Sequence, residues 1–83
     1  MAKEKQIGTV SNYFEQVSVA AIKLTGNLKV GDTIRFVGGD IEFEQLVESM
    51  QINRKPVDSA KKGDEVGIKI TEKVRKDYKV YKI

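Results

Sequence analysis

Hydrophobic and polar residues alternate with a period of two along much of the chain, which is the spacing of side chains on the two faces of a β-strand. Runs of this kind, or β-branched runs of similar length, cover residues 7–10, 17–24, 33–37, 41–52, 66–70 and 78–80. Turn-forming residues separate them at residues 12–16, 26–32, 38–40, 53–64 and 72–77. The pattern therefore predicts about six short strands.

The run from residue 41 to residue 52 changes phase along its length. Ile41 and Phe43 place their side chains on one face, whereas Met50 and Ile52 continue in the opposite phase. A one-residue slip of this kind moves side chains from one face of a sheet to the other. The phase change therefore predicts a bulge or a sharp bend near residues 48 and 49.

Two segments also fit a helix. In residues 43–50, Phe43, Val47 and Met50 are spaced as on one helical face, and residues 56–62 are long enough for one helical turn. The strands on either side of residues 43–50 and the preceding Gly-Gly pair favour a sheet there. A single turn in residues 56–62 would leave the fold class unchanged.

Several short strands at this spacing are typical of an all-β barrel or sandwich. An open sheet of this size would expose its edges, so we expect a small six-stranded antiparallel barrel, closed or nearly closed. The length of 83 residues fits one domain, residues 1–83, with a flexible N-terminus at residues 1–5. The predicted core side chains are Ile22, Ile34, Phe36, Phe43, Val47, Val66 and Ile68.

The composition limits the chemistry. The chain has no Cys and no His, which removes disulfides, thiolate nucleophiles, zinc–thiolate sites and the commonest general base. We find no paired acids at a catalytic spacing and no nucleophile motif, so we expect a non-catalytic protein without metal or cofactor. No apolar run approaches ~18 residues, and the charged first residues are unlike a secretory signal. The expected location is cytoplasmic, with no membrane contact.

Two Gly-Asp pairs, at residues 31–32 and 63–64, each stand directly before a predicted strand. Glycine supplies the positive φ of a tight turn, and aspartate forms hydrogen bonds with its own local backbone. Each pair alone is a common turn. Both pairs together belong to a longer set of segments, namely residues 7–10, 26–34, 47–51, 55–60 and 63–68.

In these segments the chain resembles the second domain of elongation factor Tu-type translational GTPases, a β-barrel, over nearly its whole length from about residue 6 to residue 83. A similar barrel lies at the C-terminus of collagenase-like peptidases. The resemblance implies a translation elongation factor-like barrel that works near the ribosome. The chain has no phosphate-binding loop of the Gly-x-x-x-x-Gly-Lys type, so no GTP binding is expected. No residue of the family's tRNA pocket can be matched here.

Positive charge is concentrated in the second part of the chain. Residues 1–52 carry 5 basic and 7 acidic residues, and residues 53–83 carry 10 basic and 5 acidic ones. The basic residues in predicted loops are candidate contacts to RNA phosphates: Arg54, Lys55, Lys61, Lys62, Lys73, Arg75 and Lys76. The aromatic residues that could stack on bases are Tyr13, Phe14, Tyr78 and Tyr81. The first hypothesis is therefore a binding module for tRNA, rRNA or the ribosome. Lysines beside strands also serve solubility and edge protection.

A second hypothesis is a protein–protein adaptor or subunit that supplies a barrel domain to a separately encoded enzyme. Its candidate contact residues are Tyr13, Phe14, Asp40, Glu42 and Glu44. Adjacent strand residues point to opposite faces, so we expect one of the two aromatic side chains to be exposed. The three carboxylates lack the glycine and terminal glutamate of a calcium-binding loop. They predict an exposed polar face or a surface for a basic partner, and no metal site.

Overall fold

The computed structural model describes residues 5–39 and 41–83, and across this part of the chain every regular element is a β-strand. In chain order the strands are β1 (Lys5–Phe14), β2 (Val19–Leu24), β3 (Leu28–Lys29), β4 (Thr33–Val37), β5 (Glu42–Leu46), β6 (Met50–Ile52), β7 (Lys55–Val57), β8 (Ser59–Ala60), β9 (Glu65–Lys69) and β10 (Lys79–Lys82). The all-β prediction is confirmed. Residues 1–4 of the predicted flexible N-terminus lie outside the described residues, and Lys5 begins β1. No helix within the described ranges has the length and apolarity to cross a membrane.

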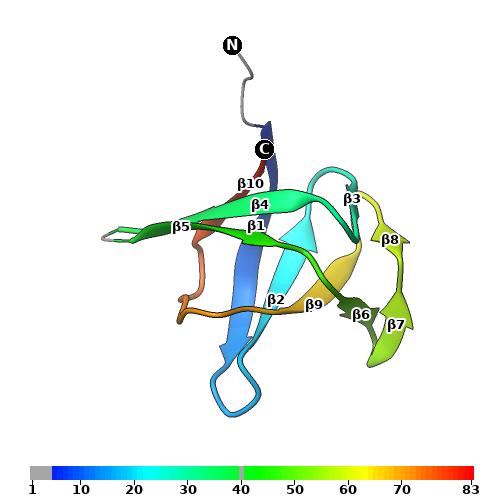
Figure 1. The fold of residues 1–83 in the computed structure, drawn as a ribbon, viewed down its shortest axis with the longest axis horizontal. Helices are drawn as coiled ribbons and strands as arrows, with labels where there is room; N and C mark the ends of the chain where they lie inside the picture. Colours follow the sequence, from blue (N-terminus) through cyan, green and yellow to red (C-terminus); the bar gives the residue numbers. More distant parts are fainter. Residues whose placement is uncertain (1–4, 40) are drawn as a thin grey trace.

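Eight strands form one antiparallel sheet in the order β5-β4-β10-β1-β2-β9-β6-β7, and β3 pairs with β8 in a second, small sheet. The large sheet curls into a half-barrel (Figure 1). The prediction of a six-stranded barrel is therefore wrong in its strand number. The run of residues 41–52 divides into two strands, and residues 28–29 and 55–60, which the sequence assigns to turns or to a possible helical turn, form β3, β7 and β8.

The division between β5 and β6 produces the curl. β5 ends at Leu46 and β6 begins at Met50, so the strand is interrupted where the phase change predicts a bend. Val47 in the gap is fully buried; its N–H donates to the carbonyl of Asp32 at 2.8 Å, and its carbonyl accepts from the N–H of Gly31 at 2.9 Å. Because β5 pairs with β4 while β6 pairs with β9, one run of residues reaches both ends of the sheet.

β1 is longer than its sequence pattern predicts, because residues 12–14 continue to pair with β2 where a turn is expected. Its register shifts once against β10 and once against β2. Such bulges bend a strand and increase its twist. A Cβ at Gly8 would lie 2.8 Å from both the side chain of Ile22 and the carbonyl oxygen of Lys23, so this close approach depends on glycine.

The two Gly-Asp turns, at residues 31–32 and 63–64, have the same construction. The glycines have φ values of 99° and 94°. Each aspartate accepts a hydrogen bond from the backbone N–H of the lysine three residues earlier, at 3.0 and 3.1 Å. The local geometry predicted from each pair is therefore confirmed. β3 leads into the first turn and β8 into the second, and these two strands pair with each other in the small sheet.

The core fills the inside of the curled sheet. Six of the seven predicted core side chains are buried, namely Ile22, Ile34, Phe36, Val47, Val66 and Ile68. Phe43 is half-buried and stacks on Phe36, with ring centroids 5.0 Å apart and an angle of 12° between the rings. Val74, in the segment between β9 and β10, is also buried although no strand contains it.

Candidate functional site

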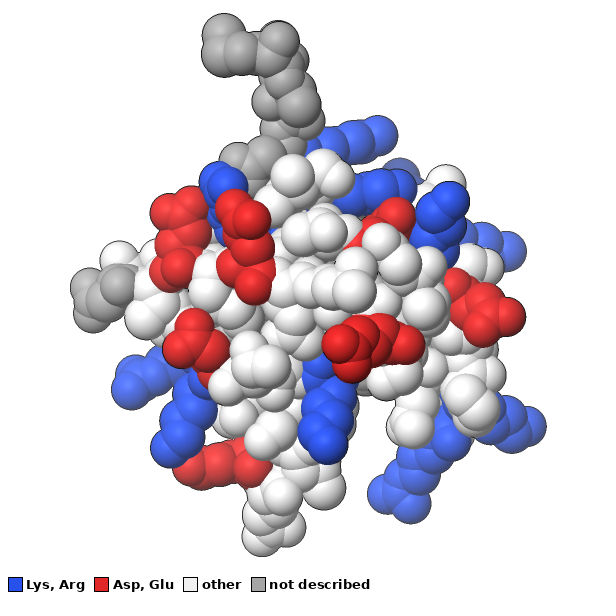
Figure 2. All heavy atoms as spheres, viewed as in Figure 1, with Lys and Arg blue, Asp and Glu red and all other residues white. Residues whose placement is uncertain are grey.

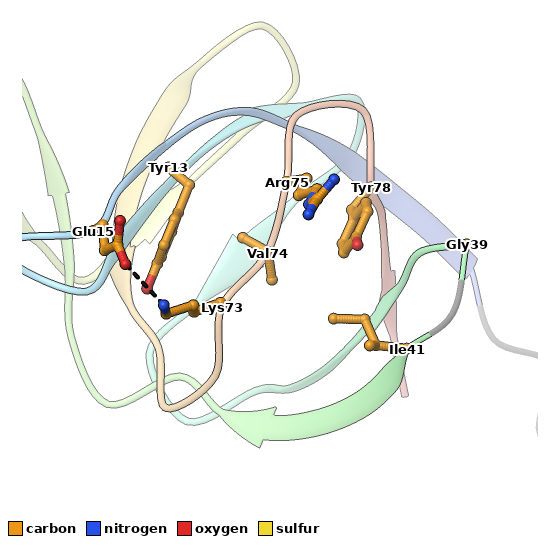
Figure 3. A pocket seen from close by; sticks show the side chains of 8 residues that line it. All are labelled: Tyr13, Glu15, Gly39, Ile41, Lys73, Val74, Arg75 and Tyr78. Atoms are coloured by element: carbon orange, nitrogen blue, oxygen red, sulfur yellow. Dashed lines mark ion pairs between the residues drawn. The ribbon is translucent and has the colours of Figure 1, made fainter.

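A hollow of about 690 Å³ lies between the end of β1, the turn that joins β4 to β5, and the segment of residues 70–78 that joins β9 to β10 (Figure 3). We call it the seam hollow. It is lined by Tyr13, Glu15, Gly39, Ile41, Lys73, Val74, Arg75 and Tyr78. Three parts of the chain that are distant in sequence therefore contribute to one surface site.

Val74 anchors the segment that forms one side of the seam hollow. Its side chain is 3% exposed, whereas Lys73 and Arg75 on either side of it are exposed. The segment is also tied to β1, because the N–H of Asp77 donates to the carbonyl of Val10 at 2.8 Å. Figure 3 shows Val74 between Tyr13 and Tyr78. The buried Val74 thus anchors the backbone of the segment, while Lys73 and Arg75 on either side of it lie at the exposed rim of the hollow.

The ring of Tyr78 lies directly against the backbone of Gly38. A Cβ at Gly38 would overlap the ring, because its three nearest neighbours would all be ring atoms at less than van der Waals contact distance. The ring is half-buried and packs against the core. Glycine at this position therefore gives Tyr78 its place as one wall of the seam hollow.

An ion pair spans the opposite end of the seam hollow. The Nζ of Lys73 lies 2.8 Å from a carboxylate oxygen of Glu15, and the dashed line in Figure 3 marks this pair beside Tyr13. The hydrogen bond and the charge of Lys73 lower the pKa of Glu15, and Glu15 in turn raises the pKa of Lys73. Both side chains are largely exposed, at 69% and 77%, so solvent screens the attraction. The pair orients Lys73 toward the tip of the β1–β2 hairpin.

The seven basic residues predicted to contact RNA are all exposed, but they lie at three separate places along the chain. Arg54 lies in the β6–β7 turn, Lys55 is the first residue of β7 and not part of a loop as expected, and Lys61 and Lys62 lie at the β8–β9 turn. The remaining three are in the segment of residues 70–78, which Figure 1 shows on the opposite side of the molecule from β7 and β8. In Figure 2, Lys and Arg side chains are spread around the rim of the visible face with Asp and Glu between them. Lys73, Arg75 and Lys76 therefore lie apart from the other four basic residues.

The two aromatic residues predicted to contact a partner take different positions. Tyr13 is half-buried and lines the seam hollow, whereas Phe14 is 49% exposed at the end of β1. The prediction that one of the pair is exposed is confirmed. Asp40, the first residue of the predicted acidic surface, lies outside the described residues.

Glu42 and Glu44 are engaged within the sheet. Both point outward from β5 and pair with Arg35 on β4, at 3.2 and 2.5 Å. One arginine thus offsets much of the charge that the sequence offers to a basic partner. Across the described ranges, no group of three or more His, Cys, Asp or Glu residues could hold a metal ion.

The sequence did not indicate Glu15, Gly39, Ile41 or Val74 as members of a site, and it indicated Tyr78 as a residue that could stack on nucleic-acid bases. One signal was present. Val74 is a single apolar residue among basic ones, which indicates that its loop is anchored to the core, and Val74 is buried in the structure. The Gly38–Tyr78 contact joins residues 40 positions apart and has no local pattern in the sequence.

Comparison with known proteins gives one sequence relative and a close structural match. No protein family model matches this sequence. The chain is 48% identical over 77 residues to an uncharacterized protease of Methanocaldococcus jannaschii, and the alignment covers 92% of this chain and 19% of the protease. The chain therefore spans about a fifth of the length of this relative.

Two solved structures from Geobacillus thermoleovorans share the fold. The C-terminal domain of a protein assigned to the U32 peptidases matches with a TM-score of 0.89 at 21% identity, over 95% of this chain and 92% of that one. Its selenomethionine variant matches with a TM-score of 0.88 at 20% identity, over 92% and 96% of the two chains.

The chain thus has the half-barrel fold found in the C-terminal domain of a U32 peptidase. More particularly, its sequence is similar to one segment of an archaeal protease. These findings support the predicted similarity to the C-terminal barrel of collagenase-like peptidases. They do not show the resemblance to the elongation factor domain.

Proposed function

We propose that this protein supplies a non-catalytic half-barrel domain to a peptidase of the U32 type. The observation that carries the proposal is the 48% identity to a protease over 92% of this chain but only 19% of the protease. A match of that shape is typical of a module within a larger enzyme. The fold agreement with a C-terminal peptidase domain supports the same interpretation.

The role of such a domain is contact with a partner rather than chemistry. With neither His nor Cys in the chain, the residues in the seam hollow are suited to holding a ligand by packing and charge. A role in translation or RNA binding receives no support from the comparisons. The basic residues also lie at three separate places along the chain, whereas the phosphate-contact hypothesis invoked them as one set.

The test uses the Methanocaldococcus jannaschii protease. Its 77-residue matching stretch is deleted, and this chain is either added as a separate protein or fused in its place. We expect the added chain to bind the truncated protease with an affinity measurable by calorimetry. The protease's own 77-residue stretch should compete with this chain for that binding site. The fused chain should restore the unfolding temperature of the intact protease.

An unrelated β-domain of similar size and net charge serves as the control in both arms. The proposal is wrong if this chain does no better than the control in either arm. Binding to tRNA with an affinity that falls steeply as salt rises would instead support the RNA-binding hypothesis, because the release of counterions from phosphates has that signature.

A further inference from the structure

We propose that the seam hollow binds an extended polypeptide segment in which an apolar or aromatic side chain stands next to a carboxylate. This inference deepens the proposed function and rests on it only in taking a polypeptide of the peptidase system as the partner. Three independent features of the described residues carry it: the walls of the hollow, the charge of its rim, and the open edge of the neighbouring strand.

The walls are suited to an apolar side chain. Tyr13 and Tyr78 stand on two sides, Val74 lies between them, and Ile41 adds an aliphatic surface (Figure 3). Both tyrosine rings are partly buried and pack against the hydrophobic core. Aromatic walls favour a further ring or a large aliphatic group, whose burial removes apolar surface from water.

The rim is suited to a carboxylate. Residues 69–79 contain five basic and two acidic residues. The charge of Lys73 is shared with Glu15, but Arg75 lies at the other end of the hollow, beside Tyr78 in Figure 3. A guanidinium group presents paired N–H donors that match the two oxygens of a carboxylate. An acidic residue of the ligand is therefore expected next to the side chain that enters the hollow.

The neighbouring strand edge is suited to an extended backbone. β5 is the last strand of the large sheet and pairs only with β4 in the part of the chain that is described. The Gln45 side chain bridges the seam farther along, donating to the carbonyl of Lys69 at 2.6 Å and accepting from the N–H of Thr71 at 3.0 Å. The stretch of β5 between Ile41 and Gln45 thus adjoins the hollow as an open edge. Open edges are sites where extended peptides add as a further strand.

The same features favour a polypeptide over a nucleic acid. A base could stack on the tyrosines, but it would make no use of a strand edge. A nucleic acid also carries a phosphate at every nucleotide, and the Glu15 carboxylate lies in the hollow. A single ligand carboxylate needs only Arg75, at the end away from Glu15.

The experiment selects binders for this protein from a displayed library of random linear peptides and measures the enriched sequences by fluorescence polarisation. We expect the enriched peptides to share an aromatic or large aliphatic residue next to Asp or Glu. Arg75→Glu should weaken their binding by about tenfold or more. Lys61→Glu makes the same charge change on an exposed residue of a distant loop, and it should leave binding within about twofold.

Three results would overturn the inference: no shared motif among selected peptides, equal losses from Arg75→Glu and Lys61→Glu, or binding of single-stranded oligouridine in place of the peptides. The proposed function fails separately. If the truncated protease still binds the Arg75→Glu variant normally, the domain has its proposed role but contacts its partner elsewhere. If selected peptides bind as expected while the protease does not, only the proposed function is wrong.

Discussion

Gly38→Ala should destabilise the fold and displace one wall of the seam hollow. The added Cβ would overlap three atoms of the Tyr78 ring. Because the Cβ is attached directly to the backbone and cannot rotate away, the ring must move. Gly38 does not have a positive φ, so alanine can adopt its backbone conformation. The substitution therefore isolates the steric contact.

The expected cost follows from forcing a half-buried ring out of its packing position. Overpacking of this kind costs ~1–3 kcal/mol. In a domain of this length, each 1 kcal/mol lowers the Tm by about 4–8 °C. We therefore expect a fall in Tm of roughly 5–20 °C, with the loss of ligand binding at the seam hollow as a second consequence.

The assay is thermal and urea unfolding followed by circular dichroism, with Gly39→Ala as the matched control. A Cβ at Gly39 would meet no heavy atom within 4 Å, so this neighbour should change stability by less than about 0.5 kcal/mol. Both variants lose the same chain flexibility in the unfolded state, and their difference therefore reports the clash with Tyr78. The double variant Gly38→Ala with Tyr78→Ala should be more stable than the two single losses predict. Equal stability of the Gly38→Ala and Gly39→Ala variants would refute the reasoning.

Three further expectations concern the turns, the ion pair and the seam. Asp64→Ala removes the acceptor for a backbone N–H in its turn and should cost about 0.5–1.5 kcal/mol in urea unfolding; an unchanged midpoint would show that the bond contributes nothing. Glu15 should titrate below its ordinary pKa of 4.5 in carboxyl ¹³C NMR, and Lys73→Gln should return it toward that value. Because folding lowers the pKa of Glu15, the ion pair contributes to stability at pH values above the ordinary pKa, and this contribution is lost as the pH falls through the lowered pKa of the folded protein. Identical Glu15 titrations in the unchanged protein and the Lys73→Gln variant would contradict this. Gln45→Ala should speed hydrogen exchange at the Thr71 amide, while amides in β2 keep their rates, and unchanged exchange at Thr71 would show that the side chain does not hold the seam.

The parts of the fold that sequence could predict are those with a local cause. β4 coincides with residues 33–37 because five alternating residues suffice to define two faces. The two Gly-Asp turns follow from the backbone freedom of glycine and the short aspartate side chain. The bend in residues 41–52 follows from the phase change.

The parts that escaped prediction have non-local causes or too few residues. β3 and β8 contain two residues each, which is too short for a period of two to be visible. The β6–β7 hairpin turns through Asn53 and Arg54, both at positive φ. Asparagine is common in such a turn, but arginine is not, so the pair carries no clear turn signal. The seam hollow is likewise assembled from three distant segments, and no single segment predicts it.

The break that shortens β5 also explains why a site exists at the seam. If residues 41–52 formed one strand along β4, no second strand β6 would follow Val47 and pair with β9, and the sheet would lack its curl. Because the run is divided, β5 is the edge strand of the sheet, and its first residues lie beside residues 70–78. Hydrogen bonds from the Gln45 side chain, and not a backbone ladder, join β5 to Lys69 and Thr71. Such a seam leaves backbone groups and apolar walls together at the surface. The interruption that curls the sheet is thus also the one that forms the seam hollow, where we propose that a polypeptide binds.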